Sequence, residues 1–359
     1  TSQELLEVGT GAFQDGFYQV AEAQFREFLQ AYPRHTHIPQ AMYLLGRALY
    51  EQRKFVEAKE TFISLLTTST AFQAKDAVYF WLGRCCEQLR DIPSAQSNLL
   101  TVVTKYPRSP WYYSALFLLG KISFDDGWYK RAEMYLRKVL QNEDANISSA
   151  LSFSTRFWLG LSLYEQGRYR ETADLLQDII DSKVKTDFRE EALYWLGEAH
   201  IQLHQYKKGA AVFRTLLECF PQSALTAHAL YGESLCLYMG GRKKEALNGL
   251  LVLKKAFSHT SLLIHVLSFI GEIYIDLDRY KEAIEIFREF LSRFPNNERR
   301  IQILVNLGWC YLMQGDLERF KTISYEIVEQ SQGGREKALA QYSIAAINTY
   351  EGNCQEAMP

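Results

Sequence analysis

The chain has 359 residues, of which 47% are hydrophobic and 14% aromatic, and its formal net charge at pH 7 is −2. This near-neutral balance argues against nucleic acid as a partner, because nucleic-acid-binding domains carry a marked basic excess. No apolar run reaches the roughly 18 residues that a membrane-spanning helix needs, so we expect no membrane span in these residues.

Glycine recurs along the chain at a fixed interval, beginning at Gly9. The interval is 37 residues throughout, except for one slip of three residues before Gly160. Self-similarity at a period of this length is the signature of a repeat architecture. The ten recurring positions, which we call anchors, are Gly9, Gly46, Gly83, Gly120, Gly160, Gly197, Ser234, Gly271, Gly308 and Ala345.

Each repeat predicts a pair of helices, as the one around Gly46 illustrates. Apolar residues recur at three- and four-residue spacing over residues 41–49, and after a short polar turn Phe55, Ala58 and Phe62 continue the same period. This period is typical of amphipathic helices. We expect the anchor glycine and the alanine twelve residues later to let the two helices approach closely, with the aromatic side chains on either side of them.

The order of glycine, aromatic residue, alanine, aromatic residue and proline resembles the tetratricopeptide-repeat (TPR) family from about Ser2 to Ala357. The resemblance implies an all-α, right-handed superhelical solenoid of about nine full TPR helix hairpins plus a truncated one. The repeat at Ser234 departs most from the pattern, because serine replaces the glycine and Lys243 replaces the first aromatic residue.

The repeat length of 37 residues exceeds the family's usual length of about 34. The added residues lie between the proline and the next anchor, so we expect the first helix of each hairpin to be about one turn longer. Ser109, Ser223 and Asn297 are expected N-caps, with Pro110 at the first helical position.

Four aromatic–proline pairs add a narrower resemblance, to the longer repeats of bacterial cell-envelope TPR proteins of the outer-membrane assembly lipoprotein and Tol-Pal coordinator type. This resemblance implies a periplasmic or outer-membrane-associated protein. The alternative is a cytoplasmic one, which six cysteines without Cys-x-x-Cys or zinc spacing favour. We expect those cysteines to be buried structural thiols. The pairs are Tyr32-Pro33, Tyr106-Pro107, Phe220-Pro221 and Phe294-Pro295.

No linker or shift in composition divides the chain, so residues 1–359 are expected to form a single solenoid. The slip in the repeat predicts a longer inter-repeat loop at residues 141–149. The chain begins without methionine inside the first helix of a repeat, and we therefore infer that it is a segment of a longer protein.

The candidate partner-binding groove follows from the resemblance, because in the TPR family residues three before and one after the anchor face the concave surface. The aromatic column is Tyr43, Phe80, Phe117, Phe157, Tyr194 and Tyr231, and the basic column is Arg47, Arg84 and Lys121. In later repeats the second column turns acidic, with Glu198 and Glu272. The alternative is that the aromatic residues only pack between helices and the charges are solvated.

Histidines supply the remaining candidates for chemistry. His200 and His204 are four residues apart, and His228 and His265 share a repeat position. No carboxylate or cysteine in the local sequence completes a metal site with His200 and His204, so structural roles are favoured for them. For His228 and His265 a metal or pH-sensing role is the alternative to a structural one. We predict no catalytic residue, no metal and no cofactor.

The sequence therefore predicts a protein–protein interaction scaffold or adaptor that binds a partner peptide or domain along its concave groove. The leading context is bacterial cell-envelope assembly. The alternatives are a cytoplasmic assembly or regulatory adaptor, and the targeting arm of an enzyme whose catalytic domain lies outside this segment. Self-association through the ends of the array is also open.

Overall fold

The computed structural model describes residues 1–69, 72–141, 148–182, 188–331 and 333–350. Within these residues all regular secondary structure is α-helical, which confirms the all-α prediction. The helices are α1 (Ser2–Gln14), α2 (Tyr18–Ala31), α3 (Ile38–Glu51), α4 (Phe55–Thr68), α5 (Lys75–Gln88), α6 (Ile92–Lys105), α7 (Tyr112–Asp125), α8 (Tyr129–Leu140), α9 (Ser149–Tyr164), α10 (Tyr169–Asp181), α11 (Arg189–Gln202), α12 (Tyr206–Cys219), α13 (Thr226–Met239), α14 (Lys243–Ala256), α15 (Leu263–Asp276), α16 (Tyr280–Arg293), α17 (Arg300–Met313), α18 (Leu317–Gln330) and α19 (Arg335–Tyr350).

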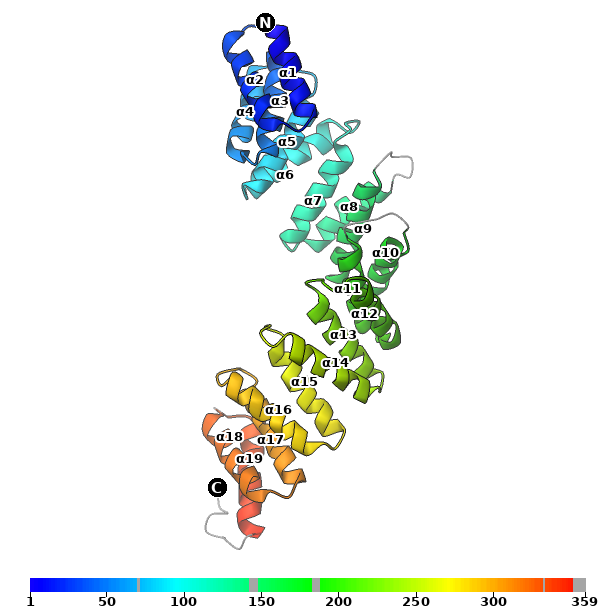
Figure 1. Cartoon of the computed structure of the whole chain (residues 1–359), viewed down its shortest axis with the longest axis vertical. Coiled ribbons are helices and arrows are strands. Elements are labelled where there is room, and N and C mark those ends of the chain that lie inside the picture. Colours follow the sequence, from blue (N-terminus) through cyan, green and yellow to red (C-terminus); the bar gives the residue numbers. More distant parts are fainter. Residues whose placement is uncertain (70–71, 142–147, 183–187, 332, 351–359) are drawn as a thin grey trace. The chain divides into compact units, whose positions relative to one another are not determined.

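Consecutive helices form antiparallel hairpins joined by short turns (Figure 1). The chain divides into two compact units, Thr1–Phe188 and Arg189–Pro359, which we call unit 1 and unit 2. Unit 1 holds the five hairpins from α1 to α10, and unit 2 holds four hairpins followed by α19. The described helices thus confirm nine full hairpins, which the single helix α19 follows. The longer loop predicted at 141–149 falls in unit 1, but residues 142–147 lie outside the described part of the chain.

Most anchor glycines mark a close approach of the two helices of their hairpin, although at Gly308 an added Cβ atom would make only ordinary contacts, at 3.4 Å or more. A Cβ atom on Gly46 would lie 2.6 Å from Cε1 of Phe62, and one on Gly120 would lie 2.6 Å from Cγ of Leu136. Phe62 and Leu136 are fully buried on the second helices, so the glycines leave the space that these side chains occupy. The expected packing role of the anchors is therefore confirmed.

In the hairpin at Ser234 the two helices also make a close contact, but here the glycine lies on the second helix. Ser234 is buried, and its hydroxyl donates a hydrogen bond of 2.7 Å to the carbonyl of Leu230. Opposite it, on α14, lies Gly249, where a Cβ atom would meet Oγ of Ser234 at 2.5 Å. The glycine that is missing from the anchor thus reappears fifteen residues later.

The first helices are not a turn longer as a rule, contrary to the prediction. In the hairpin of α3 and α4 both helices have 14 residues, and only α9, with 16 residues against 13 in α10, is clearly longer than its partner among the described hairpins. The added residues instead form the connection to the next hairpin, which covers residues 106–111 after α6 and 220–225 after α12.

The expected N-caps lie in these connections and do not cap the helices. Helix α7 begins at Tyr112, two residues after Pro110, and the hydroxyl of Ser109 accepts a hydrogen bond of 3.0 Å from the backbone N–H of Trp111. Short polar side chains make such bonds to the backbone two residues on in turns. The same hydroxyl donates to Oδ2 of Asp76 on α5 at 2.6 Å, so the connection is attached to the preceding hairpin. Ser223 makes the equivalent bonds, to the N–H of Leu225 and the carboxylate of Glu190, and Asn297 accepts from the N–H of Arg299.

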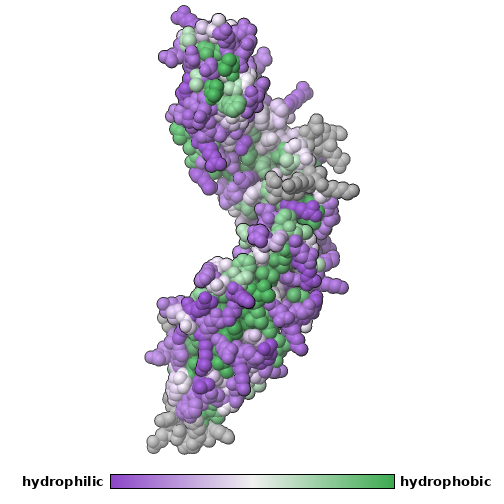
Figure 2. Space-filling view, in the orientation of Figure 1, coloured by the Kyte–Doolittle hydropathy of each residue, from purple (hydrophilic) through white to green (hydrophobic). Residues whose placement is uncertain are grey.

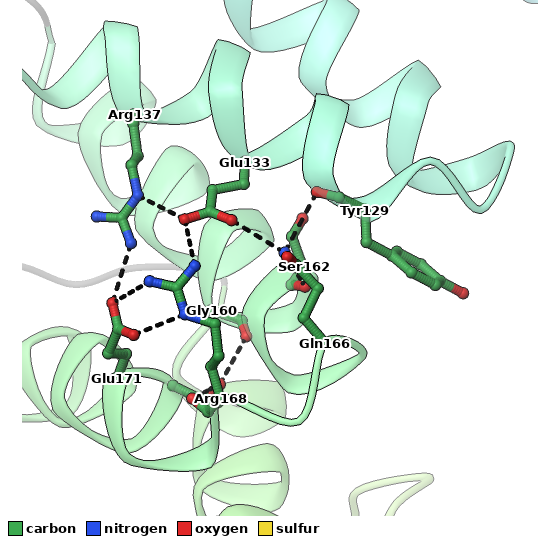
Figure 3. Close-up of polar contacts among 9 residues, drawn as sticks. Tyr129, Glu133, Arg137, Gly160, Ser162, Gln166, Arg168 and Glu171 are labelled. Atoms are coloured by element: carbon green, nitrogen blue, oxygen red, sulfur yellow. Dashed lines mark hydrogen bonds and ion pairs between the residues drawn. The ribbon is translucent and has the colours of Figure 1, made fainter.

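Polar side chains tie neighbouring hairpins together on their second helices (Figure 3). Glu133 on α8 accepts hydrogen bonds from Nε of Arg137 at 2.8 Å, Nη1 of Arg168 at 2.6 Å and Nε2 of Gln166 at 3.1 Å. Both arginines also reach Glu171 on α10. We call this group the Glu133 joint. Burial raises the pKa of Glu133, but the hydrogen bonds from Arg137, Arg168 and Gln166 outweigh it and hold that pKa below its usual value.

The same arrangement recurs between the first two hairpins. There Glu22 on α2 accepts from Nε of Arg26 at 2.9 Å, Nζ of Lys54 at 2.7 Å and Nε2 of Gln52 at 2.9 Å. Each of these residues has the same offset from its anchor as its counterpart in the Glu133 joint. The repeat therefore carries a polar contact between hairpins as well as an apolar one within them.

Replacement of Gly120 by alanine should lower stability by about 1–3 kcal/mol, because the added methyl group overpacks the contact with Leu136. Gly11 is the matched control, since it also lies within a helix but has nothing within 4 Å of its Cβ position. Gly11→Ala should raise stability by about 0.5–1 kcal/mol. Thermal denaturation of the two variants checks this, and equal effects would contradict the proposed contact.

The Glu133 joint should stabilise the fold only where Glu133 is ionised. Its pKa is lowered from 4.5 in the folded chain, so the stabilisation is complete above pH 4.5 and is lost as the pH falls through the lower, folded-state value. Glu133→Gln should cost about 1.5–3 kcal/mol at neutral pH. Melting curves of both proteins from pH 7 to 3 test this: the difference should be constant above about pH 5.5 and shrink below pH 4.5.

Candidate functional site

The predicted aromatic column lies on the first helices of the hairpins, but two of its members are buried in unit 1. Phe80 is 3% exposed and stacks on Trp111 with ring centroids 4.5 Å apart. Phe157 stacks on Phe188 at 4.9 Å. Trp111 and Phe188 belong to the connections that follow the two hairpins, so these members of the column pack between a first helix and the next connection.

The other members of the column are half-buried and keep part of their surface in solvent. In unit 1, Tyr43 lies 6.2 Å from Phe72 between ring centroids, and Phe117 packs against a cluster that includes Leu136 and Leu159. In unit 2, the rings of Tyr194 and Phe213 are 6.0 Å apart, and those of Tyr231 and Phe269 are 5.9 Å apart. These four are the members of the column that a partner could touch. Burial, and next the charge of Glu272, raises the pKa of Tyr231.

Two of the three predicted bases meet on one tryptophan. The guanidinium carbon of Arg47 lies 3.8 Å from the ring centroid of Trp81, and that of Arg84 lies 5.1 Å from it. Arg84 is also 4.9 Å from the ring of Tyr50, and Arg47 is 5.4 Å from the ring of Phe13. Such distances are those of cation–π interactions. Among the described residues, the one ion pair of the two arginines is a long one, 3.9 Å between Nη2 of Arg47 and a carboxylate oxygen of Glu51.

Lys121 has a different environment from the two arginines. Its Nζ lies 3.5 Å from a carboxylate oxygen of Glu87 and 5.9 Å from the ring of Trp158. The pair with Glu87 neutralises this base, so the structure brings Arg47 and Arg84 together and leaves Lys121 outside their cluster.

Trp81 was not among the residues predicted from the sequence, although it is the centre of this cluster. It is 4% exposed, and its ring lies 5.0 Å from Tyr50, which is four residues after the preceding anchor. Trp81 itself is two residues before its own anchor. Other repeats also carry aromatic residues at these two offsets. A comparison of all repeats at these offsets would therefore have identified the aromatic pairs. The further pairs are Phe124 with Trp158 at 5.2 Å and Tyr238 with Phe269 at 5.1 Å.

In unit 2 the corresponding first-helix positions carry carboxylates. Burial raises the pKa of Glu198, and a hydrogen bond with Tyr194 partly opposes that shift. Glu272 is exposed and accepts a hydrogen bond of 3.0 Å from Ser268. The change from basic to acidic side chains between the first helices of unit 1 and those of unit 2 is therefore present in the folded chain.

The histidines do not form a metal site in the described part of the chain. His200 is buried and burial lowers its pKa, whereas His204 lies in the following turn with φ +56° and its Nδ1 is 2.8 Å from the hydroxyl of Tyr206. Across the residues that the structure describes, no three histidine, cysteine, aspartate or glutamate side chains are grouped to hold a metal ion.

Four of the cysteines are buried, as expected, and burial raises the pKa of Cys85, Cys236 and Cys310 to about 12. Cys219 is exposed at the end of α12, which corrects the expectation for that residue. The remaining one, Cys354, lies outside the described residues. None of the described helices combines the length and the apolar character needed to cross a bilayer.

Three protein-family models match separate parts of the sequence. An outer membrane lipoprotein model matches residues 1–122, a model of anaphase-promoting complex, cyclosome, subunit 3 matches residues 129–216, and a tetratricopeptide-repeat model matches residues 262–319. A search of curated proteins found no match.

Solved structures share the fold at low sequence identity. A tetratricopeptide-repeat protein from Parabacteroides merdae is 18% identical, with a TM-score of 0.51 over 76% of this chain and 98% of that one. The C-terminal part of a TPR repeat-containing protein from Cytophaga hutchinsonii is 16% identical, with a TM-score of 0.51 over 83% of this chain and 99% of that one. These similarities concern the arrangement of the helices.

The two kinds of aromatic residue in the column should respond differently to truncation. Phe80→Ala removes a fully packed ring and should cost about 3–5 kcal/mol. Tyr43→Ala, at the same repeat position but half-exposed, should cost clearly less. Chemical denaturation of both variants checks this order, and the reverse order would show that Phe80 is not a packing residue.

Proposed function

Because this chain is a tetratricopeptide-repeat protein, and such proteins act as protein–protein interaction scaffolds, we propose that it binds a partner peptide or domain along the first helices of its hairpins. We propose no catalytic step, cofactor or metal. The residues offered to the partner are the predicted groove residues that keep solvent exposure. They are Tyr43, Phe117, Tyr194 and Tyr231, together with Arg47 and Arg84.

The observation that carries this proposal is a difference between the two kinds of helix in unit 1. On the second helices, bases pair with acids of the neighbouring hairpin, as Arg26 does with Glu57 and Arg137 with Glu171. On the first helices, Arg47 and Arg84 face aromatic rings. A charge that is already paired within the protein contributes little to recognition. An unpaired charge steers association and helps to select the partner.

We further propose that the partner belongs to bacterial cell-envelope assembly and that the protein works in the periplasm or at the outer membrane. The match of residues 1–122 to an outer membrane lipoprotein model supports this. Fractionation of cells that express the full-length protein tests it: recovery with the periplasm or outer membrane supports the location, and recovery in the cytosol contradicts it.

Self-association remains part of the proposal for the first hairpin. Hydrophobic residues reach the surface of the molecule (Figure 2), and those of the first hairpin include Val8, Phe17 and Val20, all about half-exposed or more. Exposed apolar surface of this kind can receive a second copy of the chain.

Site-specific photo-cross-linking separates the faces of the hairpins. A benzophenone amino acid at Tyr43 on α3 or Tyr231 on α13 should cross-link to the native partner. The matched controls are Val56 on α4 and Val252 on α14, which are 55% and 56% exposed on the second helices of the same hairpins. They should give little product, because the partner is expected to contact the first helices.

The mass of the product identifies what is bound. A product with a different protein supports the scaffold proposal, and peptide mapping then identifies the bound segment. Cross-links from Val56 and Val252 alone would place binding on the second helices and overturn the groove. A product of twice the mass of the chain would identify a second copy as the occupant.

A further inference from the structure

Three hydrogen-bond donors in unit 1 are buried without an acceptor, and they belong to one cluster. They are Nε of Arg47, Nε1 of Trp81 and Nε of Arg84, none of which has a hydrogen-bond partner among the described residues. Buried donors are nearly always satisfied in folded proteins, and exceptions call for a physical explanation. Three such donors on three adjacent side chains indicate a place where an acceptor is missing.

Aromatic rings hold the two guanidinium groups in place. Arg47 lies near both Phe13 and Trp81, and Arg84 lies near both Trp81 and Tyr50. These residues come from α1, α3 and α5, the first helices of three successive hairpins. A guanidinium fixed against a ring has already lost much of its rotational freedom, so a ligand that binds it orders less side chain.

The carboxylates of the chain leave the cluster largely unneutralised. Glu51 approaches Nη2 of Arg47 only to 3.9 Å, and Nη1 of Arg47 donates to the hydroxyl of Tyr43 at 3.4 Å, which is a long hydrogen bond. Glu87 is paired with Lys121. Arg84 has no ion pair with any described residue, and its contacts are with the rings of Trp81 and Tyr50.

We propose that Arg47 and Arg84, positioned by Trp81, form a carboxylate-binding site for an acidic residue of an extended partner segment. The planar fork of arginine donates two parallel hydrogen bonds to a carboxylate, which is the geometry that a fixed guanidinium favours. Tyr43 lies one helical turn from Arg47 on α3 and is half-buried, so it offers a contact to an apolar side chain next to the acid.

This inference rests on the proposed function, because it names the chemistry of the segment that the first helices of unit 1 bind. It commits to a carboxylate. The carboxylate of an aspartate or glutamate side chain and that at the C-terminus of a chain share this chemistry, and the test below distinguishes them.

Fluorescence anisotropy with three synthetic peptides provides the test, on the whole chain. The first probe is a fluorescein-labelled, amidated Gly-Glu-Phe-Glu-Phe-Gly peptide. The second has glutamine in place of glutamate, and the third is the glutamine peptide with a free C-terminal carboxylate. We expect the glutamate peptide to bind about tenfold or more tightly than the amidated glutamine peptide, with affinity that falls as salt rises. Recovery of that affinity by the third peptide would assign the site to a chain end, and no recovery would assign it to side chains.

Two variants of Arg84 and a matched control identify the residues. Arg84→Gln should weaken the binding of the glutamate peptide about tenfold, and Arg84→Lys should give a smaller but clear loss, because lysine keeps the charge but not the fork. Arg131→Gln is the control, since Arg131 also lies over a tryptophan, 5.3 Å from Trp128, but on the second helix α8. It should leave affinity unchanged. Melting curves check the fold, and if Arg84→Gln is unfolded, Arg84→Lys decides.

The outcomes distinguish failure of the carboxylate site from failure of the proposed groove. Equal affinity for the glutamate and amidated glutamine peptides, or equal losses from the Arg84 and Arg131 variants, overturns the carboxylate site. If cross-links from Tyr43 still reach the native partner in that case, the groove survives and only the site is wrong. If binding of the glutamate peptide depends on Arg84 while the native partner cross-links only from the second helices, the carboxylate site stands and the proposed function fails.

Discussion

The close approach of the two helices of each hairpin is the constraint on which the rest of the structure depends. Where a Cβ atom would collide with buried Phe62 or Leu136, a glycine anchor removes the obstacle. The requirement is for a small residue at the contact and not for glycine at one position, since Ser234 is accommodated by Gly249 on the facing helix. Repetition of this contact brings the first helices of successive hairpins together, as with α1 and α3 or α3 and α5.

Once successive hairpins stack, equivalent positions form rows, and each row has its own physical environment. On the second helices of unit 1, acids and bases about one repeat apart meet and neutralise one another, as Arg137 and Glu171 do. On the first helices two of the bases, Arg47 and Arg84, contact the ring of Trp81 instead, whereas Lys121 pairs with Glu87. A ring stabilises a cation without cancelling its charge, so the contacts with Trp81 leave Arg47 and Arg84 charged.

The sequence correctly predicted which helices carry the candidate site, but not which of its residues are accessible to solvent. Position relative to the anchor was enough to place Tyr43, Arg47 and Arg84 on first helices. It could not reveal that Trp111 covers Phe80 or that Glu87 pairs with Lys121, because these contacts come from a connection and from a neighbouring hairpin. Trp81 was missed for the same reason: its importance lies in what reaches it from α3, not in its own place in the repeat.

By itself, the sequence determined the all-α hairpins, their number and the glycine contacts, since helical periodicity and the position of small residues are local properties that the repeat shows many times. The tertiary structure alone decided where the helices end, which groove residues are buried and which charges remain unneutralised. Each of these depends on side chains from another hairpin. Ser109 is the plainest case: its hydroxyl bonds Asp76, 33 residues earlier, and the added residues of the repeat form a connection attached to the preceding hairpin and not a longer helix.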